Sequence, residues 1–364
     1  LGAVVHNYRV AREAVGSGVE VYGVVKADGY GLGAVPVARA LKRAGAEGLC
    51  VALVEEGIAL REAGVTGPIV LFSGMGSGLE AEIVRWRLEP FLFRADHLEL
   101  LAGVVSPSAP CRVHLKVNTG MSRLGMRPEE VAGVLSRADG MAGLTVAGVV
   151  SHLACADALE DPTTAAQVER FSTLLASPGV AGRGLRRSMG NSAGLLAHPA
   201  TRLDWVRPGI MLYGGNPFHP SGEGGEWGIR PVVSWRTRIV SLVEVAAGTP
   251  LGYGGTRVTG RSSRIAQLPV GYGDGLDRGL SNRGMVLIDG RRVPIMGRVC
   301  MDLIAVDVTD CAGAAVGSVA TLLGGDGEES IGVDEMAGLL ETIPYEITCH
   351  LGKRVPRYYP GGDG

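Results

Sequence analysis

Short runs of apolar and β-branched residues alternate with longer segments whose apolar positions recur every three to four residues, as far as about Tyr213. This alternation predicts parallel strands joined by helices. The expected strands, eight in number, are VEVYGVVKA, LCVAL, PIVLF, EPFLF, PCRVHLKV, TVAGVVSHL, LRRSMG and TRLDWVRPGIMLYG. A parallel (β/α)8 TIM barrel requires this set, so we expect that fold for the first part of the chain.

The pattern changes after the barrel. The segment NPFHPSGEGGEWGIRP is rich in Gly and Pro and predicts a linker. Beyond it, strands and turns predominate, and VDEMAGLLETI is the one clear helix. We therefore expect a barrel domain over residues 1–231 and a mainly β C-terminal domain over residues 232–364.

Composition excludes several classes of function. The chain has 364 residues, of which 46% are hydrophobic and 20% charged, and its net charge of −2 gives no field for nucleic acid or a membrane surface. No apolar run is long enough to span a bilayer and no signal peptide is apparent, so a cytoplasmic location is expected. The cysteines and histidines form no CxxC or HExxH motif, and no metal site or disulfide framework is expected.

Polar residues follow several of the predicted strands. In a barrel of this type, the loops after the strands converge on one face, and that face carries the chemistry. Each residue alone has an ordinary structural explanation, but their gathering on one rim indicates a site. The candidates are Lys26, Tyr30, Lys116, Arg123, His152, Asn191, Ser192, Arg207 and Gly209.

Lys26 lies where the first strand leaves the core. Partial burial lowers the pKa of such a lysine and makes its amine available for a Schiff base with an aldehyde, of which pyridoxal phosphate is the obvious one. Backbone N–H groups of the turn that begins at Asn191 and of Pro208-Gly209-Ile210 could hold the phosphate. The stretches GYGLG, GMGSG and GYGDG lack the GxGxxG spacing, so nucleotide binding is not indicated.

At this point the motifs carry a family resemblance. VVKADGYGLG resembles the cofactor-lysine motif of bacterial alanine racemases, which are fold-type III pyridoxal phosphate enzymes. The resemblance implies interconversion of L-alanine and D-alanine, supply of D-alanine for peptidoglycan, and a homodimer with shared active sites. The other matching motifs, in the family's order, are KVNTGMSRLG, SHLACAD, MGNSAG, VRPGIMLYG, LGYGGT, PVGYGDG, GRVCMD and RVPRYY.

The resemblance implies two catalytic bases, Lys26 and Tyr253. A racemase removes a proton from one face of the substrate and returns one to the other, which two groups on opposite sides do most simply. It also implies that the C-terminal domain contributes Tyr253 and Met301 to the site of the partner subunit.

Arg207 is placed by the resemblance at the pyridine nitrogen of the cofactor. Because arginine does not give up its proton, the ring is a weaker electron sink, and racemisation is favoured over transamination. His152 resembles the residue beside this arginine. The full set that the resemblance and the strand ends assign to the cofactor is Lys26, Tyr30, His152, Asn191, Ser192, Arg207, Gly209 and Ile210.

Substrate recognition is assigned to Arg123, whose planar guanidinium suits a carboxylate, and to the backbone N–H of Met301. Tyr272 and Asp302 resemble residues that line the substrate channel. Lys116 matches a lysine that is carbamylated in many family members, although an unmodified lysine is equally compatible with the sequence. Lys353 stands where many relatives carry a tyrosine that borders the substrate pocket.

Three alternatives remain open. A racemase for serine or for a broad range of amino acids would carry the same motifs. A fold-type III amino-acid decarboxylase would share the barrel and Lys26, but no cysteine-bearing motif of that family is present. A non-catalytic carrier of pyridoxal phosphate would lack the second domain that holds Tyr253.

Overall fold

The computed structural model describes residues 1–73, 76, 78–220 and 227–360. It divides into two compact units, which we describe separately. Unit 1 comprises Leu1–Leu212 and Asn216–Arg230, and unit 2 comprises Tyr213–Gly215 and Pro231–Pro360.

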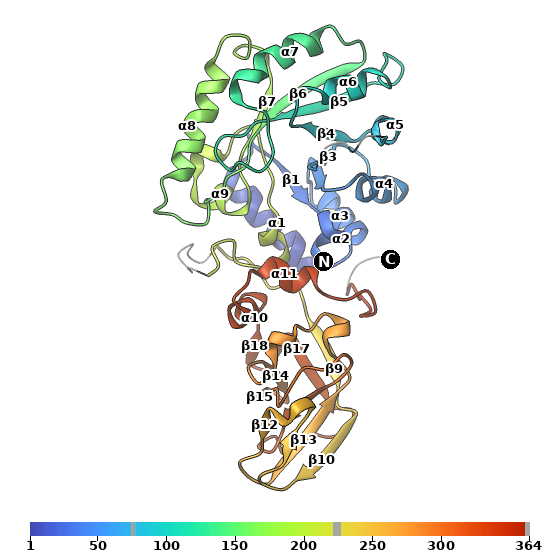
Figure 1. Ribbon diagram of the computed structural model, residues 1–364, viewed down its shortest axis with the longest axis vertical. Helices are drawn as coiled ribbons and strands as arrows, with labels where there is room; N and C mark the ends of the chain where they lie inside the picture. Colours follow the sequence, from blue (N-terminus) through green and yellow to red (C-terminus); the bar gives the residue numbers. More distant parts are fainter. Residues whose placement is uncertain (74–75, 77, 221–226, 361–364) are drawn as a thin grey trace. The chain divides into compact units, whose positions relative to one another are not determined.

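Within the described residues, unit 1 contains one sheet of eight strands, all paired in parallel, in the order β7-β6-β5-β4-β3-β2-β1-β8 (Figure 1). These strands coincide with the runs predicted from the sequence, and the (β/α)8 barrel is confirmed. Their bounds are β1 (Glu20–Val24), β2 (Gly48–Val51), β3 (Ile69–Leu71), β4 (Glu89–Leu92), β5 (Cys111–Lys116), β6 (Leu144–Val150), β7 (Arg186–Ser188) and β8 (Trp205–Val206).

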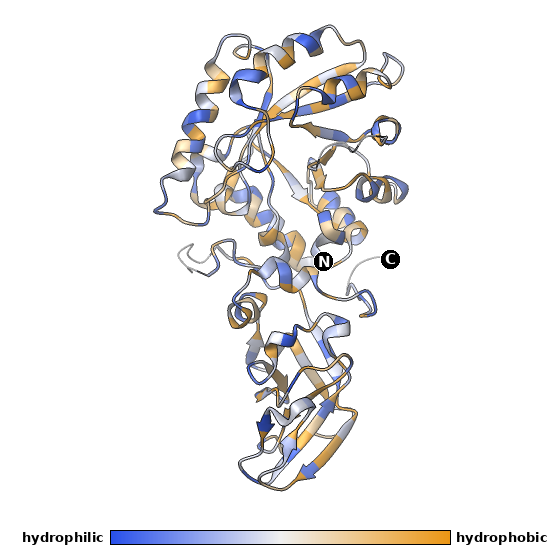
Figure 2. Cartoon of the chain, viewed as in Figure 1, coloured by the Kyte–Doolittle hydropathy of each residue, from blue (hydrophilic) through white to orange (hydrophobic). Residues whose placement is uncertain are grey.

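Helices connect the strands and cover the barrel. In α8, for example, the buried residues are Thr164, Gln167, Phe171 and Leu174, a spacing of three or four that places them on one face. Figure 2 shows the same helix alternating between hydrophobic and hydrophilic stretches. The helices are α1 (Gly2–Val15), α2 (Lys26–Tyr30), α3 (Ala34–Arg43), α4 (Val54–Glu62), α5 (Glu80–Arg85), α6 (His97–Ala102), α7 (Val131–Asp139), α8 (Thr163–Ala176) and α9 (Ser192–Ala197), with short 3-10 turns η1 (Pro128–Glu130), η2 (Pro199–Thr201) and η3 (Ile210–Tyr213).

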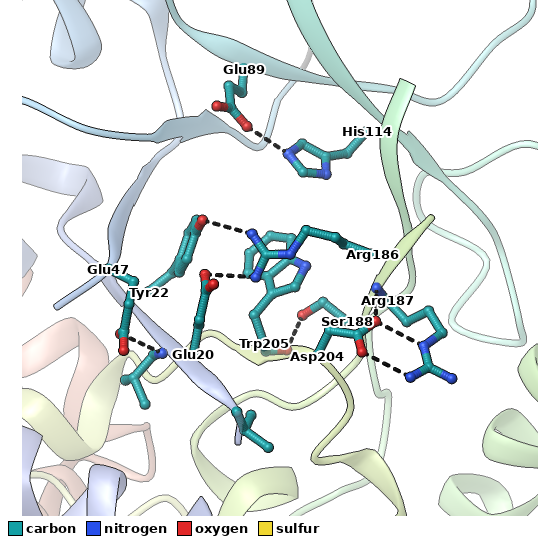
Figure 3. A network of polar contacts seen from close by, with 12 residues as sticks. Glu20, Tyr22, Glu47, Glu89, His114, Arg186, Arg187, Ser188, Asp204 and Trp205 are labelled. Atoms are coloured by element: carbon teal, nitrogen blue, oxygen red, sulfur yellow. Dashed lines mark hydrogen bonds and ion pairs between the residues drawn. The ribbon is translucent and has the colours of Figure 1, made fainter. Parts of the chain in front are cut away.

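Side chains complete the closure of the barrel between β7 and β8, which are not hydrogen-bonded as a ladder. Arg186 of β7 reaches past β8 to β1, where it donates to the Tyr22 hydroxyl at 3.2 Å and pairs with Glu20 at 2.6 Å (Figure 3). Ser188 donates to the Trp205 carbonyl at 2.6 Å. The barrel is therefore closed between β7 and β8 by these side-chain contacts as well as by two backbone bonds, from the Asp204 amide to the Arg187 carbonyl at 3.1 Å and from the Arg207 amide to the Gly190 carbonyl at 2.8 Å.

Part of the predicted linker is attached to unit 1. Asn7 of α1 donates to the Arg230 carbonyl at 2.9 Å and accepts from the Arg230 amide at 2.7 Å. The segment before unit 2 is thus held to the first helix at this point. Residues 221–226 of the predicted linker lie outside the described residues, as do 74, 75 and 77 of the GMGSG stretch.

Unit 2 is built from antiparallel sheets, which confirms the mainly β C-terminal domain. One sheet has the order β10-β13-β16, β11 pairs with β12, and a further sheet has the order β15-β14-β17-β18 with β9 beside β17. The strands are β9 (Trp235–Arg238), β10 (Ser241–Val245), β11 (Pro250–Leu251), β12 (Arg257–Val258), β13 (Ser263–Leu268), β14 (Met285–Ile288), β15 (Arg291–Pro294), β16 (Ile304–Asp307), β17 (Val319–Asp326) and β18 (Glu329–Ile331).

Unit 2 also differs from the sequence prediction in one helix. Besides α10 (Val333–Leu340), which the sequence indicates, it forms α11 (Pro344–Cys349). Pro344 occupies the first turn of α11, where its missing N–H leaves no helical hydrogen bond unmade. This helix is too short for a hydrophobic period to be visible in the sequence. Three 3-10 turns complete the unit, namely η4 (Tyr253–Gly255), η5 (Tyr272–Asp274) and η6 (Arg278–Leu280).

Candidate active site

Lys26 leaves the core in an uncommon backbone conformation. It follows the buried strand β1, and the three residues after it, Ala27, Asp28 and Gly29, have φ between 52° and 60° with ψ between 46° and 49°. Consecutive left-handed residues cost about 1–2 kcal/mol each for non-glycine residues. The surrounding contacts must therefore hold this turn, and with it the base of the Lys26 side chain.

Glu56, at the third position of α4, supplies one of these contacts. Its carboxylate accepts from the Ala27 amide at 2.6 Å and from the Ala52 and Leu53 amides at 2.7 and 3.1 Å. It thus ties the Lys26 turn to the end of β2. Asp28 adds a contact to the Ala34 amide at 2.8 Å. Sequence reasoning missed Glu56, although a glutamate in the first turn of a helix after a strand is a recognisable N-terminal signal.

A pocket of amides and hydroxyls lies at the ends of β1, β7 and β8. The Ser192 hydroxyl, which is 3% exposed, accepts from the Gly209 amide at 2.9 Å. A Cβ on Gly209 would collide with the hydroxyl of the buried Tyr30, so only glycine fits there. In the described residues, the amide of the fully buried Ile210 has no hydrogen-bond partner. This unmet donor, together with the hydroxyls, is the chemistry that a phosphate group requires.

Asn191 is a structural support of this pocket. Its side chain caps α9 by accepting from the Gly194 amide at 2.8 Å. This contact fixes the direction of the helix whose first residue is Ser192. The structure thus brings together Tyr30, Ser192, Gly209 and Ile210, while the Asn191 side chain is engaged with its own helix.

Arg207 is buried, with 3% of its surface exposed. Its guanidinium donates to the Ser188 hydroxyl, to the Ser151 carbonyl at 2.7 Å and to the Met189 carbonyl at 3.4 Å, and approaches His152 Nδ1 at 3.4 Å. Burial lowers the pKa of Arg207 to about 10, which still leaves it charged at neutral pH. A buried cation is therefore held mainly by neutral acceptors and lies beside His152, as the sequence predicted.

His152 and Lys116 share this cationic surrounding. The pKa of His152 lies well below its usual value, because of burial and of the charges of Lys116, Arg207, Arg123 and Lys26. Burial and the charges of Arg207 and Arg123 likewise hold the pKa of Lys116 well below its usual value. His152 is thus neutral near pH 7.

Arg123 extends from a well-anchored loop. Asn118 accepts from the Gly120 and Ser122 amides, both at 3.0 Å, and Gln167 of α8 donates to the Thr119 hydroxyl at 3.1 Å. Arg123 is exposed and, within the described residues, makes no hydrogen bond or ion pair, so its guanidinium is available for an anion. Sequence reasoning did not identify either residue: Asn118 bonds to amides two and four residues further on, a local signal that could have been recognised, whereas Gln167 contacts Thr119, 48 residues away.

The remaining predicted residues belong to unit 2. Tyr253 lies at the tip of the β11–β12 hairpin with 72% of its surface exposed, and Met301 and Tyr272 are 54% and 44% exposed. Backbone contacts join the last two loops, since the Tyr272 amide donates to the Cys300 carbonyl at 2.9 Å. Asp302 pairs with Arg354 at 2.7 Å. Unit 2 thus presents these residues on turns and leaves the aromatic and methionine side chains uncovered within the described chain.

No cluster of His, Cys, Asp and Glu that could hold a metal ion occurs among the described residues, and none of their helices is long and apolar enough to cross a membrane. Fold and residues together define a class of protein: a barrel enzyme with its reactive groups at the carboxyl ends of the strands, followed by an antiparallel domain.

Comparison with known proteins identifies the family. The model described as "Alanine racemase, N-terminal domain" matches residues 1–217, and the one described as "Alanine racemase, C-terminal domain" matches residues 232–359. The alanine racemase of Sorangium cellulosum is 42% identical over 97% of this chain and 96% of its own length. That of Halothermothrix orenii is 39% identical over 99% and 95%. The chain belongs to the alanine racemase family.

Solved structures agree. The alanine racemase from E. faecalis superposes with a TM-score of 0.92 and 35% identity, covering 98% of this chain and 95% of that chain. The alanine racemase from Bartonella henselae, described with covalently bound pyridoxal phosphate, has a TM-score of 0.87 and 30% identity, covering 98% and 97%. The sequence-based recognition of the family is confirmed.

Proposed function

We propose that the protein interconverts L-alanine and D-alanine with pyridoxal 5'-phosphate at the barrel mouth. The observation that carries this proposal is the position of Lys26 at the end of β1, in the same rim as a phosphate-sized set of donors and a buried, charged Arg207. Family membership supplies the substrate and the cofactor. In the cytoplasm, such an activity would supply D-alanine for peptidoglycan.

The residues of the rim fit the cofactor. Tyr30, Ser192 and the amides of Gly209 and Ile210 would hold its phosphate, Arg207 would face its ring nitrogen, and Lys26 would attach it through Nζ. When bound, the cofactor supplies an electron sink that weakens the Cα–H bond of the amino acid. His152, kept neutral by burial and by neighbouring positive charges, would support the position of Arg207.

Lys26 and Tyr253 would move the proton. Lys26 Nζ would take or return it on one face of the substrate and Tyr253 Oη on the other, so that each direction of the reaction uses the same pair in opposite roles. Water must be excluded from both groups for this exchange to be efficient. The 72% exposure of Tyr253 supports a role in which another surface covers it.

We infer that this surface belongs to a second copy of the chain, in a homodimer with shared sites. Tyr253, Met301, Tyr272 and Asp302 of one subunit would then complete the barrel mouth of the other. Arg123 and the Met301 amide would bind the substrate carboxylate, and Tyr272 and Asp302 would line the route to it.

Lys116 would support Arg123 as a carbamate. Carbon dioxide adds to a neutral amine, and burial among cations favours the neutral form of Lys116. The carbamate would carry a negative charge into a group that includes Arg123 and Arg207 and thereby offset their repulsion. The low pKa of the buried amine is what supports this modification.

The test is to incubate the purified protein with single L-amino acids and measure the D-enantiomers. We expect D-alanine as the main product, and borohydride reduction should fix the cofactor on Lys26. Carbon dioxide release would indicate a decarboxylase, whereas cofactor binding without turnover would indicate a carrier. Serine turnover at or above that of alanine would indicate the broader racemase, and label on Lys116 or Lys353 would refute the assignment of Lys26.

A further inference from the structure

The GYGDG stretch of unit 2 packs unusually close to its neighbours. A Cβ on Gly271 would collide with the carbonyl oxygens of Cys300 and Met301, and a Cβ on Gly273 would lie 2.6 Å from Arg354 Nη2. Gly271 is therefore required by close approach of the backbone, and Gly273 leaves room for the Arg354 guanidinium, so phosphate binding is not needed to explain either glycine. The turn η5, which carries Tyr272, is pressed against the Cys300–Asp302 segment and against Arg354.

Arg354 connects the two segments through its planar guanidinium. Nε and Nη2 donate to the two carboxylate oxygens of Asp274 at 2.7 and 3.2 Å, and Nη2 also donates to Asp302 at 2.7 Å. The same Nη2 lies 3.3 Å from the Met301 carbonyl oxygen. Asp274 in turn accepts from the Gly271 amide at 2.9 Å, so the turn and Arg354 share one carboxylate.

These contacts fix the direction of two peptide groups. The Cys300 carbonyl accepts from the Tyr272 amide and the Met301 carbonyl accepts from the Gly273 amide, both at 2.9 Å. Both peptides are trans, and in a trans peptide the N–H points away from the C=O. The amides of Met301 and Asp302 are therefore directed away from η5, and neither has a hydrogen-bond partner in the part of the chain that the structure describes.

We propose that Arg354 is a positioning residue for substrate binding: its bonds to Asp274, Asp302 and the Met301 carbonyl hold the Cys300–Asp302 peptides with their N–H groups presented to the carboxylate of the amino acid. The proposal rests on the proposed function, because it gives these two amides a carboxylate ligand. Arg354 itself does not touch the reacting atoms. A planar, multidentate cation is required, since the ammonium of lysine cannot reproduce the guanidinium's paired contacts with one carboxylate.

The experiment compares Arg354→Met and Arg354→Lys with the wild-type, cofactor-loaded protein. For Arg354→Met we expect KM for L-alanine and the dissociation constant of propionate, a carboxylate without an amine, to rise about tenfold, the loss of one hydrogen bond to a charged group. The kcat should change less than about threefold. The amides of Tyr272 and Gly273, which donate to the fixed carbonyls, should exchange hydrogen faster, and Arg354→Lys should give a smaller effect in each measurement.

Arg292→Met is the matched control. Arg292 also bridges two carboxylates of unit 2, those of Glu329 at 2.7 Å and Glu335 at 2.5 Å, but it contacts neither η5 nor Met301. In the Arg292→Met variant, we expect the KM for L-alanine, the propionate affinity and the hydrogen exchange of the Tyr272 amide to remain at wild-type values. A comparable change in Arg292→Met would show a general effect of losing ion pairs and would overturn the proposal.

Two further outcomes would overturn it. The first is an Arg354→Met variant that binds propionate as tightly as wild type. The second is an Arg354→Met variant with a raised KM but with unchanged hydrogen exchange at the Tyr272 and Gly273 amides. If Arg354→Met does not fold, Asp302→Asn, which retains the Asp274 pair, must raise the propionate dissociation constant by a smaller factor. Wild-type protein that binds cofactor but does not racemise alanine would refute the proposed function instead, while the exchange comparison would still test whether Arg354 holds the peptides.

Discussion

The two units hold their site residues in opposite ways. In unit 1, Arg207 is 3% exposed and surrounded by fixed acceptors, whereas in unit 2, Tyr253 is 72% exposed at the tip of a hairpin. A buried cation loses its hydration, so each of its donors needs a protein acceptor. An exposed ring has no such requirement, and glycines at 252, 254 and 255 with positive φ shape only the turn beneath it.

The difference explains which part of the site is complete within one chain. The barrel rim already has its packing, its hydrogen bonds and its shifted pKa values. In unit 2, Asp302 is paired with Arg354, whereas Tyr253, Met301 and Tyr272 have exposed side chains, which under the proposed function would acquire a defined surrounding when another surface covers them. Under the proposed function, unit 1 would set cofactor binding and stability, whereas unit 2 would contribute mainly to turnover and substrate recognition.

The largest expected effect is that of Tyr253→Phe. Loss of one general acid–base group typically lowers the rate by about 10²- to 10⁴-fold, and the exposed ring contributes little to folding. We expect racemisation to fall within that range while the cofactor remains bound and the free energy of unfolding stays within about 0.5 kcal/mol of wild type. Steady-state kinetics, cofactor absorbance and urea unfolding measure the three quantities.

Tyr358→Phe is the control for this variant, because Tyr358 is also an exposed tyrosine of unit 2, at 83%. It should leave the rate unchanged. Racemisation by Tyr253→Phe at nearly the wild-type rate would show that a single base suffices and would remove the contrast between the units.

The next effect is one of stability and concerns Arg207→Lys. Lysine keeps the charge, but its single ammonium cannot donate at once to the three acceptors of the guanidinium, which are the Ser151 carbonyl, the Ser188 hydroxyl and the Met189 carbonyl. Each buried group left unpaired costs about 1–3 kcal/mol, so we expect the apoprotein to lose about 2–4 kcal/mol of unfolding free energy. Arg187→Lys is the matched control on the exposed end of β7, where the pair with Asp204 should be worth at most about 1 kcal/mol.

If urea unfolding without cofactor shows that both variants lose the same free energy of unfolding, burial does not explain why Arg207 cannot be replaced by lysine. A loss only in the cofactor-loaded protein would place the role of Arg207 in cofactor binding rather than in the fold.

The sequence predicted the barrel well because most of its strands are apolar runs, with the polar β7 as an exception, and because polar residues follow several of them. Lys26, His152 and Arg207 follow directly from that pattern, since the carboxyl ends of parallel strands meet on one face. What it missed are residues whose partners are distant in the chain. Glu56 and Arg354 act through contacts 29 and 80 residues away in sequence, and neither spacing follows from a local period.

The helix α11 and the role of GYGDG were missed for related reasons. A helix of six residues is shorter than two turns and shows no period. Gly271, Gly273 and Gly275 of GYGDG lie against the Cys300 carbonyl, Arg354 and the His350 carbonyl in turn, which only tertiary structure brings to them. Motif recognition located Tyr272 and Asp302, but the structure adds that Asp302 is engaged by Arg354.

The smallest expected effect concerns Lys353, the residue directly before Arg354. Lys353 is exposed, and its ammonium has no ion pair within the described residues, so the rest of unit 2 does not depend on it. A flexible lysine leaves more room than a rigid tyrosine, and we expect alanine to be preferred, with serine turned over more weakly. Lys353→Tyr should narrow the range of substrates by lowering kcat/KM for L-serine about threefold to tenfold relative to L-alanine, because one small polar contact is worth about 1 kcal/mol.

The control is Lys353→Met, which removes the charge without adding a ring. A change at a lysine of unit 1 such as Lys42 would be a poor control, because Lys42 donates to two carbonyls. If Lys353→Met narrows the range as much as Lys353→Tyr, the charge rather than the size of the residue sets the preference, and an unchanged ratio in both variants would show that position 353 does not border the substrate.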